Sequence, residues 1–334
     1  MRLRNNDTGI ALILVLWVLV LLIALATEFA LSMKTEVNTT RNFKEDIEVY
    51  YIAKAGINLA MAEILSDVQF HSWTEEKGYI FGPVVATGDQ DEGGQAFQQA
   101  SQEEALEVPE PPQRVDLPLE KGLIHYSIRD ENGKININTA SRETLTKALE
   151  VNGLSLGLER DTIVDSILDW IDQDNLLHVN GAESDYYQGL SPAYYAKNGP
   201  LDSVEELLRI KGVTPELFYG SEEYLFEEPS SSENTSGLRR IFTVQKVTQF
   251  NPNTAERVVL EIMYPDNQVE EILAKKEERG WYNESKSTHF KIEATGTFAD
   301  SPTQHTIVAI IEKQGQGNEA TLLTRYWNGN LIWR

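Results

Sequence analysis

The side chains best suited to chemistry in this sequence are carboxylates, and they gather in two short segments. Asp165, Asp169, Asp172 and Asp174 follow one another closely, and further acidic residues lie between Gly181 and Tyr187. Carboxylate oxygens are the ligands preferred by hard cations such as Ca²⁺. The spacing lets several of them converge where a predicted helix ends. We therefore hypothesise a stabilising, non-catalytic calcium site with the candidate ligands Asp169, Asp172, Asp174, Glu183 and Asp185.

Two other interpretations of these carboxylates compete with a calcium site. One is a solvated acidic loop, because runs of charge usually lie at the surface. The other is an EF-hand, in which Asp172, Asp174, Asn180 and Glu183 would take loop positions 1, 3, 9 and 12. Leu176 and Leu177 would then occupy positions 5 and 6, where a ligand and the turn glycine belong. The segment is therefore not an EF-hand.

Composition excludes several other kinds of site. The chain of 334 residues contains no cysteine, so thiolate catalysis, disulfides and cysteine-based metal sites are absent. Its 52 acidic and 29 basic residues give a net charge of −23, which argues against binding to nucleic-acid phosphates. A G-x-S-x-G match at Gly153–Gly157 follows a predicted helix instead of a strand, and no supporting histidine accompanies it. We expect no enzymatic activity.

These residues must be positioned by a chain that begins with an apolar segment. Residues Ile10 to Ala26 contain no polar side chain, and as a helix these 17 residues would extend about 26 Å, close to the thickness of a bilayer's hydrocarbon core. Arg2 and Arg4 precede them, so the positive-inside rule places the N-terminus in the cytoplasm. We predict a single membrane helix over residues 10–31, with the rest of the chain across the membrane.

Three interpretations of this N-terminus remain open. A secretory signal peptide would need a small-residue cleavage site, and the sequence after Ala26 fits one poorly. A plain membrane anchor is the second interpretation. In the third, cleavage falls between Gly9 and Ile10, before the apolar run. A short basic leader ending in glycine resembles the class III signals of type IV pilins and type II secretion pseudopilins. This resemblance implies removal of residues 1–9 by a prepilin peptidase and N-methylation of Ile10.

The fifth residue after this processing site departs from the usual pattern. Most pilin-like subunits carry glutamate there, which is thought to pair with the N-terminal amine of a neighbouring subunit, but this chain has Leu14. A buried carboxylate needs such a partner, and a subunit at the end of a filament has none above it. Leu14 therefore suits a tip subunit, and in this respect the chain resembles the minor pseudopilin K family of type II secretion systems.

The remaining sequence divides into segments of different character. The N-terminal helix is predicted to continue to Ser66 and to pack on a sheet through an apolar face formed by Phe43, Ile47, Tyr51, Ala55, Leu59, Ala62 and Leu65. An acidic loop (87–118) precedes strands over 123–138, in which Lys134–Asn138 forms the return of a hairpin. Helical patterns occupy 139–237, bounded by the polar stretch Glu227–Glu233. The second part of the body, 238–334, is predicted to contain an antiparallel sheet, with strands at His289–Phe298 and Thr306–Glu312. The last two strands, Leu322–Trp327 and Leu331–Trp333, are predicted to form a hairpin.

A short motif occurs twice. Residues Ile135–Leu145 and Phe250–Leu260 align without gaps and are identical at six of eleven positions, including Asn-x-Asn-Thr-Ala. Similar segments flank the helical domain of the pseudopilin K family. The resemblance implies an α+β fold in which a pilin-like N-terminal helix packs on a small antiparallel sheet. An all-helical domain, like SAM or helix-hairpin-helix modules, is inserted in it. The expected divisions are a cleaved leader (1–9), the membrane helix (10–31), the first part of the body (32–138), the inserted helical domain (139–237) and the second part of the body (238–334).

The resemblance also implies function and partners. Members of this family are non-enzymatic tip subunits of the pseudopilus that cap or initiate its assembly with the minor pseudopilins I and J, and some bind Ca²⁺. Further expected partners are the major pseudopilin, prepilin peptidase and the inner-membrane assembly platform, with the body of the chain in the periplasm and no nucleic acid bound. The alternative is a membrane-anchored DNA-binding protein, because Asn136–Ser141 and Leu208–Val213 resemble helix-hairpin-helix modules.

Overall fold

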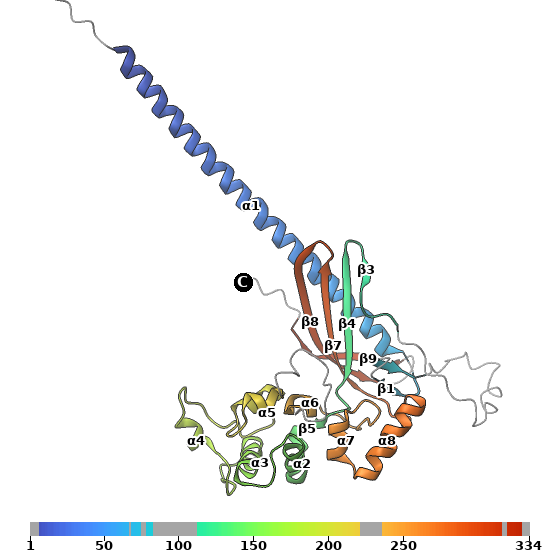
Figure 1. The fold of residues 1–334 in the computed structure, drawn as a ribbon. Helices are drawn as coiled ribbons and strands as arrows, with labels where there is room; N and C mark the ends of the chain where they lie inside the picture. The colour runs from blue at the N-terminus through green and yellow to red at the C-terminus, as the bar shows by residue number, and fades with distance from the viewer. Residues whose placement is uncertain are drawn as a thin grey trace, which may run out of the picture.

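The computed structural model describes residues 7–66, 68–74, 78–82, 112–220, 236–315 and 319–328. Most of the predicted acidic loop, the polar stretch Glu227–Glu233 and the predicted last strand Leu331–Trp333 lie outside these residues. Within them the fold is α+β, as predicted. A long N-terminal helix packs on an antiparallel sheet, and a separate group of helices follows (Figure 1).

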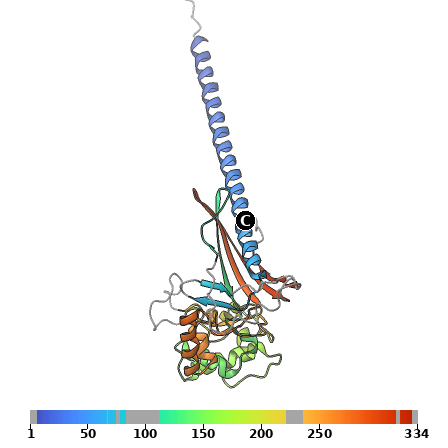
Figure 2. The same cartoon turned by 90° about the vertical axis from the view of Figure 1, so that its right-hand side faces the viewer.

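Helix α1 (Asp7–Leu65) continues without a break from the apolar segment into the body of the protein. It is the one helix among the described residues that is long and apolar enough to cross a membrane, and the apolar part is not buried by the rest of the chain. Figures 1 and 2 show its N-terminal half projecting alone, well beyond the sheet.

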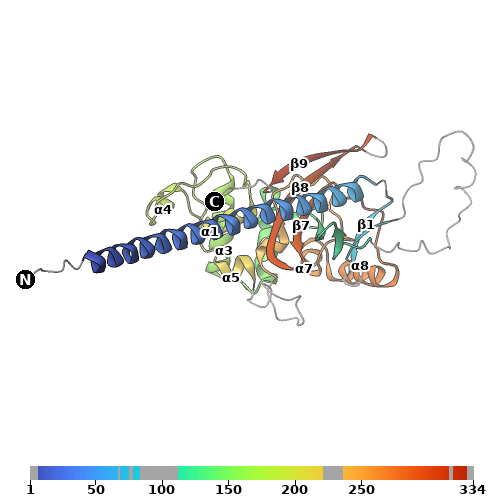
Figure 3. The same cartoon turned by 90° about the horizontal axis from the view of Figure 1, so that it is seen from above.

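The second half of α1 packs on a five-stranded sheet of order β3-β4-β7-β8-β9, in which every neighbouring pair is antiparallel. Seen along the view of Figure 3, the helix lies over the strands. The predicted strands in the C-terminal part of the chain are confirmed as β7, β8 and β9. The strands are β3 (Leu117–Leu119), β4 (Gly122–Asp130), β7 (His289–Phe298), β8 (Ser301–Gln314) and β9 (Thr321–Trp327).

The face of α1 that meets the sheet is not the one that the sequence predicted. The predicted stripe includes Tyr51 and Leu59, which are 59% and 42% exposed. The contact is instead made by a neighbouring stripe that contains small residues, because the helix and the sheet approach closely. A Cβ at Gly296 of β7 would lie 2.1 Å from the Val49 carbonyl oxygen. The buried residues of this stripe are Val49, Ile52, Ala53, Ile57, Ala60 and Ile64.

A second core holds the helical elements at the end of the sheet farthest from the start of α1 (Figures 1 and 2). It runs from Ile135 to Ile272, so the predicted boundary at 237 falls inside one continuous core. We call this group the helical unit. Its elements are α2 (Arg142–Val151), α3 (Leu158–Ile171), α4 (Ser184–Gln188), α5 (Pro215–Tyr219), α6 (Leu238–Ile241), α7 (Arg257–Met263) and α8 (Asp266–Arg279), with the 3₁₀ helices η1 (Ile137–Thr139) and η2 (Val204–Arg209).

The predicted return strand at Lys134–Asn138 is wrong. Only β5 (Ile135–Asn136) is extended there, and it pairs in parallel with β6 (Phe242–Thr243) inside the helical unit. The position beside β4 is already taken by β7, whose Phe290 is opposite Asp130. The chain therefore leaves the sheet at Asp130. A further small sheet, β1 (His71–Thr74) and β2 (Gly78–Phe81), lies beside this junction.

The two Asn-x-Asn-Thr-Ala segments have the same structural role. In each, the first asparagine accepts a hydrogen bond from the backbone N–H of the second, Asn136 from Asn138 at 2.9 Å and Asn251 from Asn253 at 3.0 Å. The second asparagine then binds a remote backbone segment. Asn138 accepts from the N–H of Leu201 and donates to its carbonyl, at 2.7 and 3.0 Å. The repeat is thus a pair of backbone clamps.

The second clamp belongs to a buried polar network at the junction. The Oδ1 atom of Asn253 accepts from the backbone of Tyr282 and Asn283, at 2.6 and 3.2 Å. Nearby, the carboxylate of Asp130 accepts hydrogen bonds from Thr254 Oγ1 (2.5 Å), from Ser287 Oγ and from two asparagines. Burial raises the pKa of Asp130 to about 6. These contacts join the sheet to the helical unit.

Candidate metal centre

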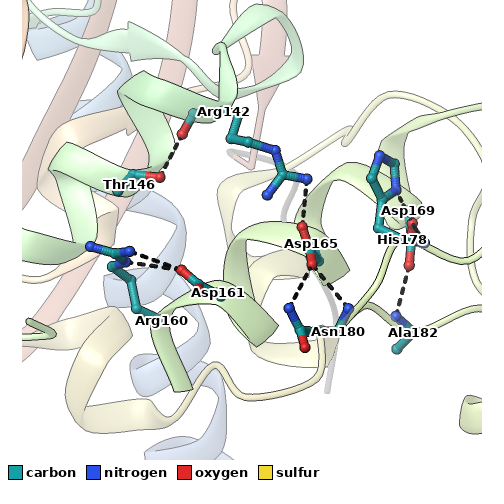
Figure 4. A network of polar contacts seen from close by, with 9 residues as sticks. All are labelled: Arg142, Thr146, Arg160, Asp161, Asp165, Asp169, His178, Asn180 and Ala182. Atoms are coloured by element: carbon teal, nitrogen blue, oxygen red, sulfur yellow. Dashed lines mark hydrogen bonds and ion pairs between the residues drawn. The ribbon is translucent and has the colours of Figure 1, made fainter. Parts of the chain in front are cut away.

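Helix α3 presents two aspartates to the interior, one turn apart. Asp165 and Asp169 lie on the same helix face because residues four apart are neighbours there, and they are 3% and 0% exposed. The Asp165 carboxylate pairs with Arg142 at 2.5 Å and accepts from the backbone and side-chain N–H of Asn180, at 3.0 and 3.2 Å (Figure 4). Burial alone would raise the pKa of Asp165, but these partners lower it below its usual value.

Asp169 is engaged with the loop that follows α3. Its Oδ1 atom accepts from the His178 N–H at 3.1 Å and contacts the His178 ring nitrogen Nδ1, while Oδ2 accepts from the Ala182 N–H at 2.8 Å (Figure 4). Both carboxylate oxygens of Asp169 therefore accept hydrogen bonds from this loop. One carboxylate oxygen of Asp169 also lies within 4.8 Å of a carboxylate oxygen of Asp172 and of a ring nitrogen of His178, so these three residues form one possible ligand group.

Three other carboxylates converge beside this loop. One oxygen each from Asp172, Asp174 and Glu183 lies within 4.8 Å of the others. Glu183 is only 7% exposed, yet neither of its carboxylate oxygens has a hydrogen-bond partner among the described residues. The Oδ1 atom of Asp172 is likewise buried without one. Burial raises the pKa of Glu183, and the charges of Asp169, Asp172 and Asp174 raise it further.

This arrangement fits a hard cation. A buried carboxylate without partners is unfavourable, and a cation would satisfy the orphaned oxygens. The three converging ligands offer only oxygen atoms, which Ca²⁺ prefers, whereas zinc sites usually contain histidine or cysteine. Asp172, Asp174 and Glu183 would supply part of the six to eight oxygen ligands that Ca²⁺ takes. The cation would neutralise the cluster and hold the end of α3 to the start of α4.

The structure thus brings together three of the five candidate ligands. Asp172, Asp174 and Glu183 converge, Asp169 supports the loop, and Asp185 lies in α4 outside both ligand groups. Sequence reasoning considered Asn180 only as position 9 of the rejected EF-hand pattern and gave Gly181 no role of its own.

Glu183 should make the stability of the metal-free protein depend on pH. A carboxyl whose pKa is raised by folding takes up a proton more readily in the folded state. This group therefore contributes stability as the pH falls through its folded pKa, which lies above 4.5, and the contribution is complete below 4.5. We expect Glu183→Gln to reduce the gain in thermal midpoint between pH 7 and pH 4.5 in chelator, while Asp130, whose pKa is also raised, contributes the same gain to both proteins. Asp185→Asn is the control, and identical profiles for all three proteins would contradict the expectation.

The basic residues of the segment Leu208–Val213, which resembles a helix-hairpin-helix module, make contacts within the helical unit. The Arg209 guanidinium lies over the rings of Tyr194 and Trp170, 4.7 and 5.8 Å from their centroids. Lys211 Nζ donates to the carbonyl oxygens of Gly181 at 2.9 Å and Asn180 at 3.4 Å. Both cations are committed to internal contacts, so the geometry does not favour phosphate binding.

Comparison with known proteins finds similarity to one family of secretion proteins. The family model described as type II secretion system (T2SS), protein K, matches residues 128–226. Among curated proteins, the putative type II secretion system protein K of Escherichia coli K12 is 26% identical over 228 residues, which is 64% of this chain. The type II secretion system protein K of Aeromonas hydrophila is 23% identical over 227 residues, or 68% of this chain. Over these regions the chain is similar to type II secretion system protein K.

The match to these protein K relatives is partial in length. The chain spans 61% of the E. coli protein and 65% of the Aeromonas protein. The protein K of Pectobacterium carotovorum is 31% identical over 115 residues, covering 30% of this chain and 35% of that protein. The crystal structure of the GspK-GspI-GspJ complex from enterotoxigenic E. coli matches with a TM-score of 0.46 and 18% identity. It covers 65% of this chain and 83% of that chain.

Proposed function

We propose that this protein is the minor pseudopilin K at the tip of a type II secretion pseudopilus. In this role it caps or initiates assembly together with the minor pseudopilins I and J, and supports protein export across the outer membrane. The similarity to type II secretion system protein K supports the proposal. The expected contacts with the major pseudopilin, prepilin peptidase and the inner-membrane assembly platform form part of it, as does a periplasmic position of everything beyond the membrane helix.

The observation that carries the proposal is the exposed apolar surface of α1 beyond the membrane segment. Tyr51, Leu59 and Leu65 are 59%, 42% and 40% exposed, although each recurs at helical spacing on one face. An apolar stripe of this kind on a soluble domain indicates a binding surface. Because α1 runs on unbroken from its membrane segment, a partner with its own parallel membrane helix could pack along it inside and outside the bilayer.

The position of the helical unit supports a place at the tip. The unit lies at the end of the sheet farthest from the N-terminus of α1 (Figures 1 and 2). Subunits added below it would approach from the membrane side and meet α1 and the sheet, while the helical unit stays outside the shaft. Leu14 is compatible with this place, since a tip subunit has no neighbour whose amine could pair with a glutamate.

Substitutions in the α1 stripe test this function. We expect the double variant Tyr51→Lys/Leu59→Lys to fold normally and to lose export of the system's substrates, because lysines would prevent close helix packing. The matched control is Leu156→Lys/Tyr195→Lys, which replaces the same residue types at exposed sites in the helical unit. Secretion assays and co-purification of the minor pseudopilins are the readouts. Normal export by the α1 variant would exclude an assembly role for the stripe.

The processing proposal has its own test. Prepilin-peptidase cleavage between Gly9 and Ile10 would give a mature peptide that starts at N-methylated Ile10. Mass spectrometry of protein purified from membranes should detect it. An intact Met1 would indicate a plain anchor, and cleavage beyond Ala26 would indicate a secreted protein.

We also propose that the candidate metal centre binds Ca²⁺. The buried, unpartnered oxygens of Glu183 and Asp172 support a cation there. Calorimetry with Ca²⁺ should show binding to the native chain and no binding to a variant in which Asp172, Asp174 and Glu183 are all alanine. Equal heats for the two proteins would remove the proposal.

A further inference from the structure

The two inward aspartates of α3 bind a loop instead of solvent. The backbone N–H groups of three alternate residues, His178, Asn180 and Ala182, all donate to Asp165 or Asp169, at 3.1, 3.0 and 2.8 Å (Figure 4). We call residues 178–183 the ligand loop, because they end at Glu183. Carboxylates that accept backbone N–H groups make strong, charge-assisted hydrogen bonds. The ligand loop is therefore fastened along α3 at three points.

The fit between the ligand loop and α3 leaves no spare room. A Cβ at Gly181 would lie 1.9 Å from Asp169 Oδ2 and 3.3 Å from the backbone carbon of Asp165. On the carbonyl side, Lys211 Nζ binds the oxygens of Asn180 and Gly181. The backbone of the loop is thus held through both its donors and its acceptors.

These contacts are complete without a cation. Asp165 has Arg142 as its counter-charge at 2.5 Å, and both oxygens of Asp169 already have donors. Glu183 is the next residue after Ala182, so the same fastening places its carboxylate, buried and unpartnered, beside Asp172 and Asp174. A cation is not required to build the loop that carries the ligand.

We propose that Asp165 and Asp169 are positioning residues that hold the ligand loop in its cation-binding shape before any cation arrives. The inference rests on the proposed calcium site. It predicts a preformed centre, in which Ca²⁺ meets oxygens that are already desolvated and assembled. The entropic cost of ordering the loop on Ca²⁺ binding is then small, because the loop already lost its conformational freedom when the protein folded.

Hydrogen exchange of the full-length protein in detergent, with chelator present, tests the proposal. We expect amides of the ligand loop to exchange slowly in the native chain and about tenfold faster in Asp165→Asn and Asp169→Asn, the change expected when one such hydrogen bond is lost. Calcium affinity measured by calorimetry should fall by about the same factor. Asp161→Asn is the matched control, since Asp161 is one turn earlier in α3 and pairs with Arg160. Amides of α8 should exchange equally in all proteins.

Two outcomes would overturn the proposal. One is rapid exchange of the native ligand loop in chelator that slows only when Ca²⁺ is added, since the cation would then order the loop. The other is unchanged exchange in both aspartate variants. If those variants do not fold, Arg142→Gln, at a half-exposed side chain, should give a smaller acceleration at Asn180, and no acceleration there would count against the role of Asp165. Absence of calcium binding by the native chain would instead refute the calcium site. Glu183→Gln should abolish binding while the loop stays protected.

Discussion

Replacing Asn251 by alanine should destabilise the protein by about 3–5 kcal/mol, because one fully buried side chain serves several buried groups. Its Oδ1 accepts from the Asn253 N–H at 3.0 Å, and its Nδ2 lies 3.1 Å from the His71 carbonyl oxygen, 2.8 Å from Ser287 Oγ and 3.2 Å from Asp130 Oδ2. Removing it leaves these groups unsatisfied, including a buried carboxylate. Denaturant unfolding of the full chain in detergent measures the loss.

The repeated motif supplies a matched control for this prediction. Asn136 holds the same motif position as Asn251 and makes the same bond to the second asparagine, but it is only partly buried and no further side-chain bond of it is found among the described residues. Asn136→Ala should therefore cost about 1 kcal/mol, as for the loss of a capping residue. If both variants lost the same free energy of unfolding, burial of the second clamp would not be the reason for its larger contribution to stability.

Replacing Gly296 by valine should separate α1 from the sheet and destabilise the body by at least about 3 kcal/mol. A Cβ there would lie 2.1 Å from the Val49 carbonyl oxygen and 2.7 Å from the Ala53 nitrogen, both backbone atoms of α1 that cannot move without breaking the helix. The side chains released from the core would include Ile52 and Ile57. Limited proteolysis within residues 45–65 and the thermal midpoint are the measurements.

Gly157 is the control for the helix–sheet contact. A Cβ at this position would meet no atom within 4 Å, and its backbone is extended, with a φ of 164°. Gly157→Val should therefore change stability by less than about 0.5 kcal/mol. If Gly296→Val were equally mild, the close packing of α1 on β7 would not be a main source of stability.

The sequence predicted the existence of α1 and of the C-terminal strands, but not which face of α1 is buried. Hydrophobic periodicity favoured the stripe through Tyr51 and Leu59 because these are large apolar residues. The sheet-facing stripe contains Ala53, Gly56 and Ala60, which rank low in hydrophobicity. These small residues lie there because larger side chains would not fit between the closely packed helix and sheet. A helix with two apolar stripes does not reveal from its pattern alone which one meets the body.

The candidate metal centre was predictable in composition and only partly in geometry. The clustering of Asp172, Asp174 and Glu183 follows from their spacing around a helix end. The direction of each carboxylate does not, because Asp169 turns towards the ligand loop through contacts with residues nine and thirteen positions away. The sequence did not assign helices α6, α7 and α8 to the helical unit, because the pattern within a helix does not show which distant core it packs against.

The junction at Asp130 also bears on how such a protein could be built and rebuilt. The strands β4 and β7 are antiparallel neighbours up to the pair Asp130 and Phe290, and the next residue, Glu131, donates its N–H to the His289 carbonyl at 2.9 Å. The chain thus departs and returns at a single point, as in an ordinary β-hairpin whose turn has been expanded into a folded unit. From this connection alone, we expect that a short turn could join the two strands in place of the helical unit, provided that the buried Asp130 carboxylate is replaced as well.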